Sequence, residues 1–166
     1  MIDCAMKASG RGSDLLGLAA FVALCFGAAA LGGLVTAESV TTWYPTLNKP
    51  AFNPPDWVFG PAWTLLYLMI AVAGWRAWRA SRTVGVRPAM ALYAVQLALN
   101  VAWSFLFFGA RSIGFALAEI VLLLTVIVIN LVMFWRVDRL AGWLLVPYAA
   151  WVSFASILNF ALWRLN

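Results

Sequence analysis

The sequence predicts an all-α integral membrane protein built as a five-transmembrane-helix bundle. Hydrophobic residues make up 65% of the chain and charged residues 10%, whereas soluble domains have about 45–50% apolar and about 25% charged residues. The mean hydropathy is +0.93. Apolar windows of about 20 residues, the length that crosses a bilayer as a helix, occur five times. The remaining segments are short apart from one, so we expect residues 1–166 to form a single transmembrane domain.

The predicted spans run from 15 to 35, 57 to 78, 90 to 108, 113 to 135 and 141 to 162. The first resembles a secretory signal peptide because Lys7 and Arg11 precede it. Its apolar run of about 21 residues is longer than the apolar region of a signal peptide. We therefore expect this span to be retained as a packing partner of the later helices.

The connection 36–56 separates the first two spans and contains four prolines: Pro45, Pro50, Pro54 and Pro55. Proline fixes φ and lacks a backbone donor, so this spacing excludes a helix and predicts a stiff connection. We expect the connection to act as a lid, with Trp43 and Tyr44 closing over a cavity. A passive connector with interfacial aromatic anchors is the alternative.

Lys and Arg are distributed unevenly about the spans. Eight of the eleven precede the first span or fall in the second and fourth connections, so the positive-inside rule predicts that the N-terminus is inside and the C-terminus outside. The net charge of +5 then reflects contact with a lipid bilayer, and no nucleic-acid partner is expected. Histidine is absent and Cys4 and Cys25 have no suitable neighbours, so we expect no metal site, disulfide or conventional nucleophile.

The third span has two distinct faces. Gln96, Asn100, Trp103 and Phe107 share one face at helical spacing. A carboxamide facing lipid would leave its polar atoms unpaired, so this face should look into the bundle, where Asn100 and Gln96 either contact a ligand or join helices. Small residues repeat on the opposite face and predict a homodimer contact. They are Ala91, Ala94, Ala98 and Ala102.

Three tryptophans lie deep within the predicted spans, whereas the others lie near span ends, where indoles anchor the interface. Trp63, Trp103 and Trp151 come from three different spans, and an indole N–H in hydrocarbon needs a partner or a polar cavity. With neighbours on the same faces they predict an aromatic cavity for a flat hydrophobic ligand. These neighbours are Phe59, Tyr67, Tyr148, Ala155 and Asn159.

Glu119 lies in the first third of the fourth span, where an ionised carboxylate is costly. It is either a proton or ligand site, or a carboxylate satisfied by Arg111 or by interfacial water. The sequence favours the second interpretation.

Three separated segments resemble the translocator protein / tryptophan-rich sensory protein family: 43–63, 97–104 and 146–159. The resemblance implies a five-helix bundle, usually a homodimer, that binds porphyrins, sterols and benzodiazepine- or isoquinoline-type drugs with no required cofactor. It implies that Trp63 and Trp151 correspond to tryptophans of light-dependent porphyrin breakdown. Pocket-lining positions of the family correspond to Tyr44, Asn100, Trp103 and Ala155.

A membrane receptor or sensor for porphyrins, with a role in tetrapyrrole transport or regulation, is therefore the expected function. The chain shows no inverted repeat of the kind that many secondary transporters display. Porphyrin degradation by Trp63 and Trp151 is the alternative, since an excited ligand can oxidise indole without a conventional acid–base set. Sterol binding is weakly indicated by Leu158, Phe160 and Arg164, because Phe160 stands where the sterol pattern has tyrosine.

Overall fold

The structure is a computed structural model that describes the backbone of residues 2–80 and 86–166, with side chains from Ser13 onward. Five helices are long and apolar enough to cross a membrane, and the described residues form no strand, which confirms the predicted all-α membrane bundle. Two 3-10 turns, Tyr44–Thr46 and Asp56–Val58, lie in the Pro-rich loop, and a π-helical turn, Phe105–Gly109, follows the third helix. The helices are α1 (Ile2–Thr42), α2 (Phe59–Ala80), α3 (Arg87–Ser104), α4 (Ile113–Val137) and α5 (Arg139–Leu165).

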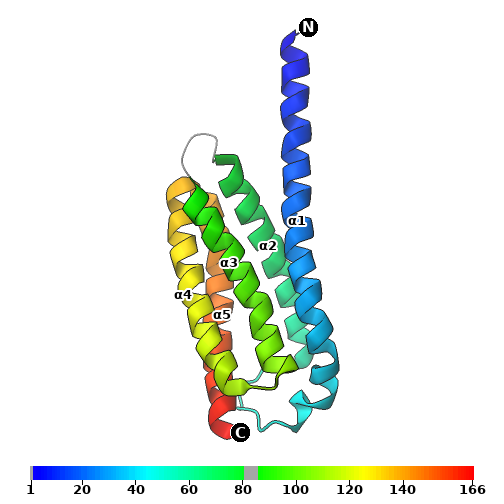
Figure 1. Cartoon of the computed structure of the whole chain (residues 1–166), viewed down its shortest axis with the longest axis vertical. Helices are drawn as coiled ribbons and strands as arrows, with labels where there is room; N and C mark the ends of the chain where they lie inside the picture. Colours follow the sequence, from blue (N-terminus) through cyan, green and yellow to red (C-terminus); the bar gives the residue numbers. More distant parts are fainter. Residues whose placement is uncertain (1, 81–85) are drawn as a thin grey trace.

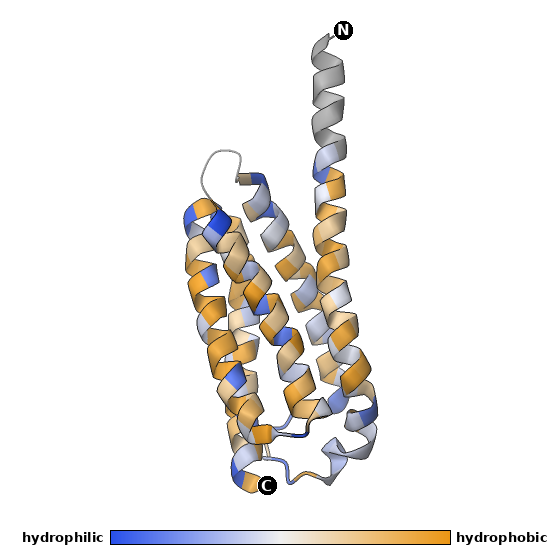
Figure 2. Cartoon of the chain, in the orientation of Figure 1, coloured by the Kyte–Doolittle hydropathy of each residue, from blue (hydrophilic) through white to orange (hydrophobic). Residues whose placement is uncertain are grey.

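The helices pack as a closed ring in the order α1, α2, α5, α4, α3, with α3 returning to α1 (Figure 1). The most extensive contact joins α4 and α5. Hydrophobic residues cover the length of the bundle (Figure 2), as expected for helices that face lipid. The ring leaves room for an interior site bounded by side chains from every helix.

The first helix ends later than the sequence predicted. We placed 36–56 outside the helix, but α1 continues to Thr42. The segment 36–42 contains no proline, and the hydroxyl of Thr42 donates to the carbonyl of Glu38 at 2.8 Å, within the last turn. The first proline of the loop, Pro45, lies only beyond Thr42, so nothing in the chain stops the helix sooner.

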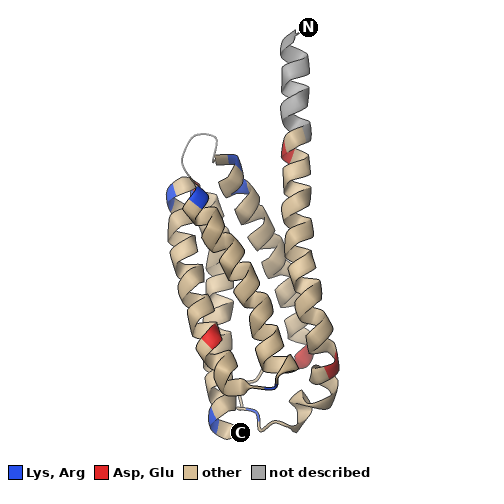
Figure 3. Cartoon of the chain, viewed as in Figure 1, with Lys and Arg blue, Asp and Glu red and all other residues tan. Residues whose placement is uncertain are grey.

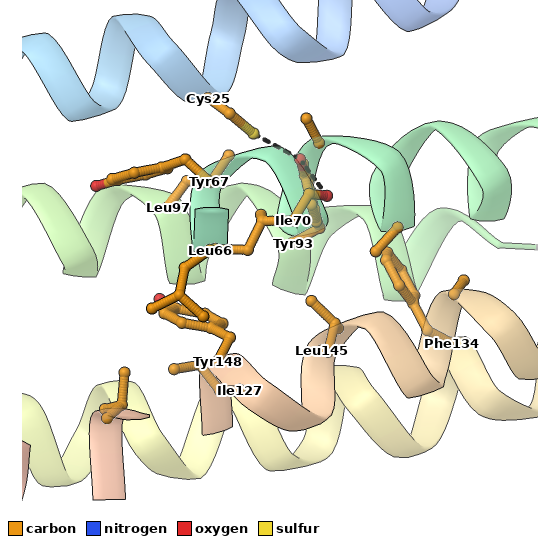
Figure 4. Close-up of a cluster of buried hydrophobic side chains, with 14 of the residues drawn as sticks. Cys25, Leu66, Tyr67, Ile70, Tyr93, Leu97, Ile127, Phe134, Leu145 and Tyr148 are labelled. Carbon is orange, nitrogen blue, oxygen red and sulfur yellow. Dashed lines mark hydrogen bonds between the residues drawn. The ribbon is translucent and has the colours of Figure 1, made fainter. Parts of the chain in front are cut away.

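The larger of the two core clusters of the described residues contains side chains from all five helices, and Tyr93 of α3 is one of its fully buried members (Figure 4). The Tyr93 hydroxyl donates to the Ile70 carbonyl of α2 at 3.2 Å and lies 3.1 Å from Cys25 Sγ of α1. Its ring stacks on Phe134 of α4 with centroids 5.9 Å apart. At Gly74 of α2, an added Cβ would lie 2.6 Å from Tyr93 Cζ. This packing joins four helices.

Two ion pairs join helices at the end opposite the Pro-rich loop. Arg76 Nη2 lies 2.8 Å from Asp138 Oδ2, and Arg79 Nη2 lies 3.1 Å from Asp14 Oδ2. Asp138 also caps α5, because its Oδ1 accepts from the backbone N–H of Ala141 at 3.0 Å. Partial burial opposes ionisation, but the hydrogen bonds from Arg76 and the backbone outweigh it and lower the pKa of Asp138.

Charged residues gather at the two ends of the bundle, and an acidic position interrupts the uncharged length of α4 (Figure 3). Glu119 is the only acidic residue of α4. Three of the basic residues that carry the orientation prediction, Lys7, Arg11 and Arg82, lie outside the described residues and side chains, as does Cys4. An inside N-terminus therefore stays a prediction.

Candidate ligand-binding cavity

A cavity of about 360 Å³ lies inside the bundle beneath the Pro-rich loop, and all five helices contribute to its wall. This volume falls within the range of about 300–1,000 Å³ typical of small-molecule sites. Nine of the ten predicted ligand-binding residues are in the wall: Tyr44, Phe59, Trp63, Tyr67, Asn100, Trp103, Phe107, Trp151 and Ala155. The tenth, Tyr148, is fully buried and lies directly behind the wall.

Nine aromatic side chains of the described residues line the cavity. Trp103 stacks on Phe107 with centroids 5.0 Å apart, and Phe59 meets Trp151 edge-on at 6.0 Å. Trp63 lies 5.5 Å from the ring of Tyr67. These separations lie in the range of favourable aromatic pairs, about 4.5–7 Å. The rings of α2, α3 and α5 thus support one another around a common space suited to a flat apolar ligand.

The three deep tryptophans differ in how their indole N–H groups are satisfied. Trp103 Nε1 donates to Asn159 Oδ1 at 3.1 Å, and Asn159 Nδ2 donates to the Ile113 carbonyl at 3.0 Å. Among the described residues, no acceptor lies at Nε1 of Trp63 or Trp151, although both side chains line the cavity. The N–H groups of Trp63 and Trp151 therefore remain available to a further acceptor.

Asn100 is held in a chain of hydrogen bonds that we call the polar chain, comprising Tyr67, Asn100 and Tyr148. The Tyr67 hydroxyl donates to Asn100 Oδ1 at 2.5 Å, and Asn100 Nδ2 donates to the Tyr148 hydroxyl at 3.0 Å. Asn100 thus both lines the cavity and joins α2, α3 and α5. Gln96, predicted on the same face, is 1% exposed, and its side-chain amide has no partner among the described residues.

The Pro-rich loop covers the cavity through Tyr44. The Tyr44 hydroxyl donates to Asn53 Oδ1 at 2.7 Å, and Lys49 Nζ lies 4.3 Å above the Tyr44 ring. Burial and the nearby charge of Asp56 raise the pKa of Tyr44 to about 12, although the bond to Asn53 opposes this. Tyr44 is therefore a neutral hydrogen-bonded cover at neutral pH. Trp43, predicted as a second lid residue, packs instead on Phe107 at 5.6 Å.

The loop is also hydrogen-bonded to Asn166, the residue that caps the C-terminal end of α5. The Asn48 backbone N–H donates to Asn166 Oδ1 at 2.9 Å, and Asn166 Nδ2 donates to the Asn48 carbonyl at 3.1 Å. Phe52 meets Phe154 of α5 edge-on, with centroids 6.4 Å apart. These contacts hold the loop over the cavity in the described state.

The π-helical turn Phe105–Gly109 shapes the wall near the loop. The Ala110 N–H donates to the Phe105 carbonyl at 2.7 Å, the wider spacing of a π-helix. Ser39 of α1 donates its hydroxyl to the Phe108 carbonyl at 2.7 Å. Such turns are often found at functional sites, and here the turn directs Phe107 and Phe108 toward the cavity.

Sequence reasoning did not assign α1 to the cavity, although it supplies Phe26, Ala29, Gly32, Gly33, Thr36 and Val40. The sequence predicted the first span only as a packing partner of the later helices. Gly32 fits that interpretation, because an added Cβ would lie 3.0 Å from Ser104 Oγ of α3. Gly33 does not, since no atom lies within 4 Å of such a Cβ. The sequence does show a run of small residues here, but such a run occurs both where two helices pack closely and where a cavity lies open beside the helix.

The residues predicted for a sterol pattern and for a homodimer contact do not line the cavity as groups. Leu158 lines the cavity, whereas Phe160 is 49% exposed on the outer face of α5 and Arg164 is also exposed. The three residues of the sterol pattern therefore do not share one surface.

On α3, the alanine face is solvent- or lipid-accessible at Ala91, Ala94 and Ala98 and half-buried at Ala102. The homodimer contact there stays a prediction.

Glu119 lacks the partner that the sequence suggested. Among the described residues it forms no hydrogen bond or ion pair, so Arg111 does not satisfy it. Arg111 is exposed in the turn before α4, with a φ of 53°.

Comparison with known proteins identifies the family. The TspO/MBR family model matches residues 21–164. The chain is 43% identical over 160 residues to the tryptophan-rich protein TspO of Chlorobaculum tepidum, covering 92% of this chain and 98% of the relative. It is 40% identical over 146 residues to the tryptophan-rich sensory protein of Cereibacter sphaeroides, covering 88% and 89%. With the Homo sapiens translocator protein it shares 40% identity over 126 residues, covering 75% of each. The chain therefore belongs to the TspO/MBR family of multi-pass translocator and sensory membrane proteins.

Proposed function

We propose that this chain is a membrane receptor or sensor that binds porphyrins and related flat hydrophobic ligands in the aromatic cavity, with a role in tetrapyrrole transport or regulation. The observation that carries the proposal is the pair of indole N–H donors, at Trp63 and Trp151, which have no protein acceptor among the described residues and whose side chains line a mostly apolar cavity. Ring nitrogens or carbonyl oxygens of a flat ligand would satisfy them.

The charge of the wall indicates how such a ligand lies. Asp56 is the only charged residue in the described wall, which has no Lys or Arg. Carboxylates buried without a cationic partner are costly, so the propionates of a porphyrin belong at the mouth. Lys49 is a candidate partner for them, because its Nζ lies 4.3 Å above the ring of the loop residue Tyr44, which covers the cavity.

Titration of the purified protein with protoporphyrin in darkness tests the proposal. Binding should quench tryptophan fluorescence, because the indoles of the wall would contact the macrocycle. Each loss of an aromatic face should weaken binding several-fold, since such contacts contribute about 0.5–1.5 kcal/mol beyond burial. A folded variant with Phe at positions 63, 103 and 151 that binds as tightly as the parent would contradict the proposal.

Light-dependent porphyrin degradation is the second candidate, favoured by the same two unpaired indoles. An excited porphyrin that accepts an electron from an indole needs contact with it, and Trp63 and Trp151 both line the cavity. Illumination of the complex should then consume porphyrin faster than the free pigment bleaches. The excess rate should fall in Trp63→Phe and Trp151→Phe; absorbance loss equal to that of free pigment would leave binding alone.

A further inference from the structure

Polar atoms buried on α3 and α4 have no protein partner. Among the described residues, both carboxyl oxygens of Glu119 and both polar atoms of the Gln96 side chain are buried without a hydrogen bond. More than about nine in ten buried polar groups in native proteins are paired. A carboxylate in the apolar part of a bilayer is especially costly. Glu119 therefore needs an explanation beyond packing.

Helix register places Glu119 level with Asn100. α3 and α4 are antiparallel, and Asn130 Nδ2 of α4 donates to the Ala89 carbonyl of α3 at 2.7 Å, which fixes their alignment. Glu119 precedes Asn130 by eleven residues, and Asn100 follows Ala89 by eleven. Eleven residues make three turns to within about 20°, so Glu119 lies at the level of Asn100, on the side of α4 from which Asn130 reaches α3. Tyr148 of α5 lies at the same level, because its hydroxyl accepts from Asn100 Nδ2 at 3.0 Å.

The polar chain leaves one donor unused beside this carboxyl. The proton of Tyr67 is committed to Asn100 Oδ1, so Tyr67 presents only lone pairs to the cavity. Asn100 Nδ2 donates to the Tyr148 oxygen, and Tyr148 retains its own proton to donate. Glu119 has two oxygens that lack donors. The polar chain thus runs from Tyr67 in the cavity wall to Tyr148, whose proton is free to donate at the level of the unpaired Glu119 oxygens.

We propose that Glu119 sets the hydrogen-bond polarity of the cavity wall at Tyr67, and so selects between ligands that donate and ligands that accept a hydrogen bond there. The inference deepens the proposed function, because it takes this cavity as the ligand site. When Glu119 is ionised, Tyr148 donates toward it, directly or through one water, and Tyr67 accepts from the ligand. When Glu119 is protonated, it donates to Tyr148, and the Asn100 carboxamide turns over so that every bond reverses. Tyr148 then donates to Asn100 Oδ1, Asn100 Nδ2 donates to the Tyr67 oxygen, and the Tyr67 proton is free for the ligand.

Few other groups act on Glu119. α4 packs on α5, α3, α2 and the π-helical turn. The titratable side chains of these elements at the level of Glu119 are Tyr148 of α5 and Tyr67 of α2, both bonded to Asn100, which does not titrate. The turn 105–109 has no ionisable residue, and Tyr93 of α3 is bound to Ile70 in the core far from this level. Nothing cationic in the described contact holds Glu119 in one protonation state.

Two flat tricyclic probes test the inference. Carbazole offers only an N–H donor, phenazine offers only ring-nitrogen acceptors, and neither titrates between mildly acidic and mildly alkaline buffer. Dissociation constants for the full chain in nanodiscs are measured by tryptophan quenching across that range. Alkaline buffer should favour carbazole and acidic buffer phenazine, with the ratio of dissociation constants changing on the order of tenfold, because a mismatched buried polar contact would be relieved.

Variants of α4 separate this effect from a general response to pH. Glu119→Leu should give a ratio that is independent of pH and equal to the acidic value of the parent, because the acceptor is absent. Glu119→Gln keeps the size without ionising and should also be independent of pH. Thr125→Leu, an exposed polar position of the same helix that bonds only to the Val121 carbonyl, should retain the parental dependence.

A double-mutant cycle tests the link through Tyr148. In a Tyr148→Phe background, Glu119→Leu should change the probe ratio no further. Infrared spectroscopy reads the same link without ligand: the carboxyl stretch lost in Glu119→Leu should shift in Tyr148→Phe. A parental ratio that does not respond to pH, a response that persists in Glu119→Leu, or a carboxyl band unmoved by Tyr148→Phe would each overturn the inference. Failure of protoporphyrin and both probes to bind would refute the proposed function, while the infrared result would still decide the link.

Discussion

Replacing tryptophan by phenylalanine should have different consequences at Trp103 and at Trp63. Trp103 Nε1 donates to Asn159 Oδ1 at 3.1 Å, and Asn159 is 1% exposed. Phenylalanine at position 103 would leave that buried oxygen without its donor. Trp63 Nε1 has no acceptor among the described residues, so phenylalanine at position 63 would leave no buried protein group unpaired.

The expected loss of stability follows from the unpaired oxygen. A buried acceptor that loses its donor costs about 1–3 kcal/mol, and we expect Trp103→Phe to lower the free energy of unfolding by that amount. For a chain of this length, 1 kcal/mol corresponds to about 2–4 °C in Tm. Trp63→Phe should lower Tm by less than Trp103→Phe. It should instead weaken protoporphyrin binding several-fold, because a ligand loses a donor and part of an aromatic face.

Thermal unfolding and protoporphyrin titration of both variants, in one detergent and in darkness, measure these effects side by side. Trp151→Phe serves as a second case of an indole without a protein acceptor, and it should behave as Trp63→Phe does. Equal losses of Tm at positions 63 and 103 would refute the reasoning, because the Trp103–Asn159 hydrogen bond would then not be what distinguishes the two sites.

Three other perturbations address the dimer, the loop and the ion pairs. Ala98→Leu should convert dimers to monomers in light scattering, since added bulk at a close contact costs about 1–3 kcal/mol; an unchanged dimer fraction would place the contact elsewhere. Pro50→Ala with Pro54→Ala should weaken porphyrin binding and increase proteolysis of the loop, at about 0.4–1 kcal/mol per proline. Normal binding, with no protection of the loop by ligand, would instead indicate a passive connector. The lowered pKa of Asp138 contributes stability that is complete above the ordinary value of 3.8 and is lost as pH falls through the folded-state value. Tm measured against pH should therefore fall more steeply in acid for the parent than for Arg76→Gln, and identical curves would exclude a contribution from this pair.

The spans were predictable because the length of an apolar run is a local property of the chain. The end of α1 was not, since apolar character fades at 36–42 while the helix continues. Hydrogen bonding within the last turn, as at Thr42, satisfies the polar side chains there without ending the helix. Proline gave the firmer signal, because it acts on its own backbone whatever the surroundings.

The aromatic side of the cavity was predictable for a related reason. Residues of one helix that share a face are set by spacing, so Trp103 and Phe107 could be assigned together. The spacing of small residues does not tell a close helix contact from a position beside open space. Gly32 approaches Ser104 closely, whereas its neighbour Gly33 faces open space, and only the position of α3 relative to α1 distinguishes them.

The surroundings of Glu119 could not be predicted from the sequence. Arg111, eight residues earlier, is its nearest basic residue along the chain, and proximity in sequence favoured that pairing. The bundle instead aligns Glu119 with Asn100 through a hydrogen bond three turns away, at Asn130, and brings Tyr148 from a third helix to the same level. A polar group inside a membrane must find its partners on other helices because lipid offers none. The role of such a group therefore depends on helix register. Register is set by the packing of the whole bundle and cannot be predicted from the sequence of one span.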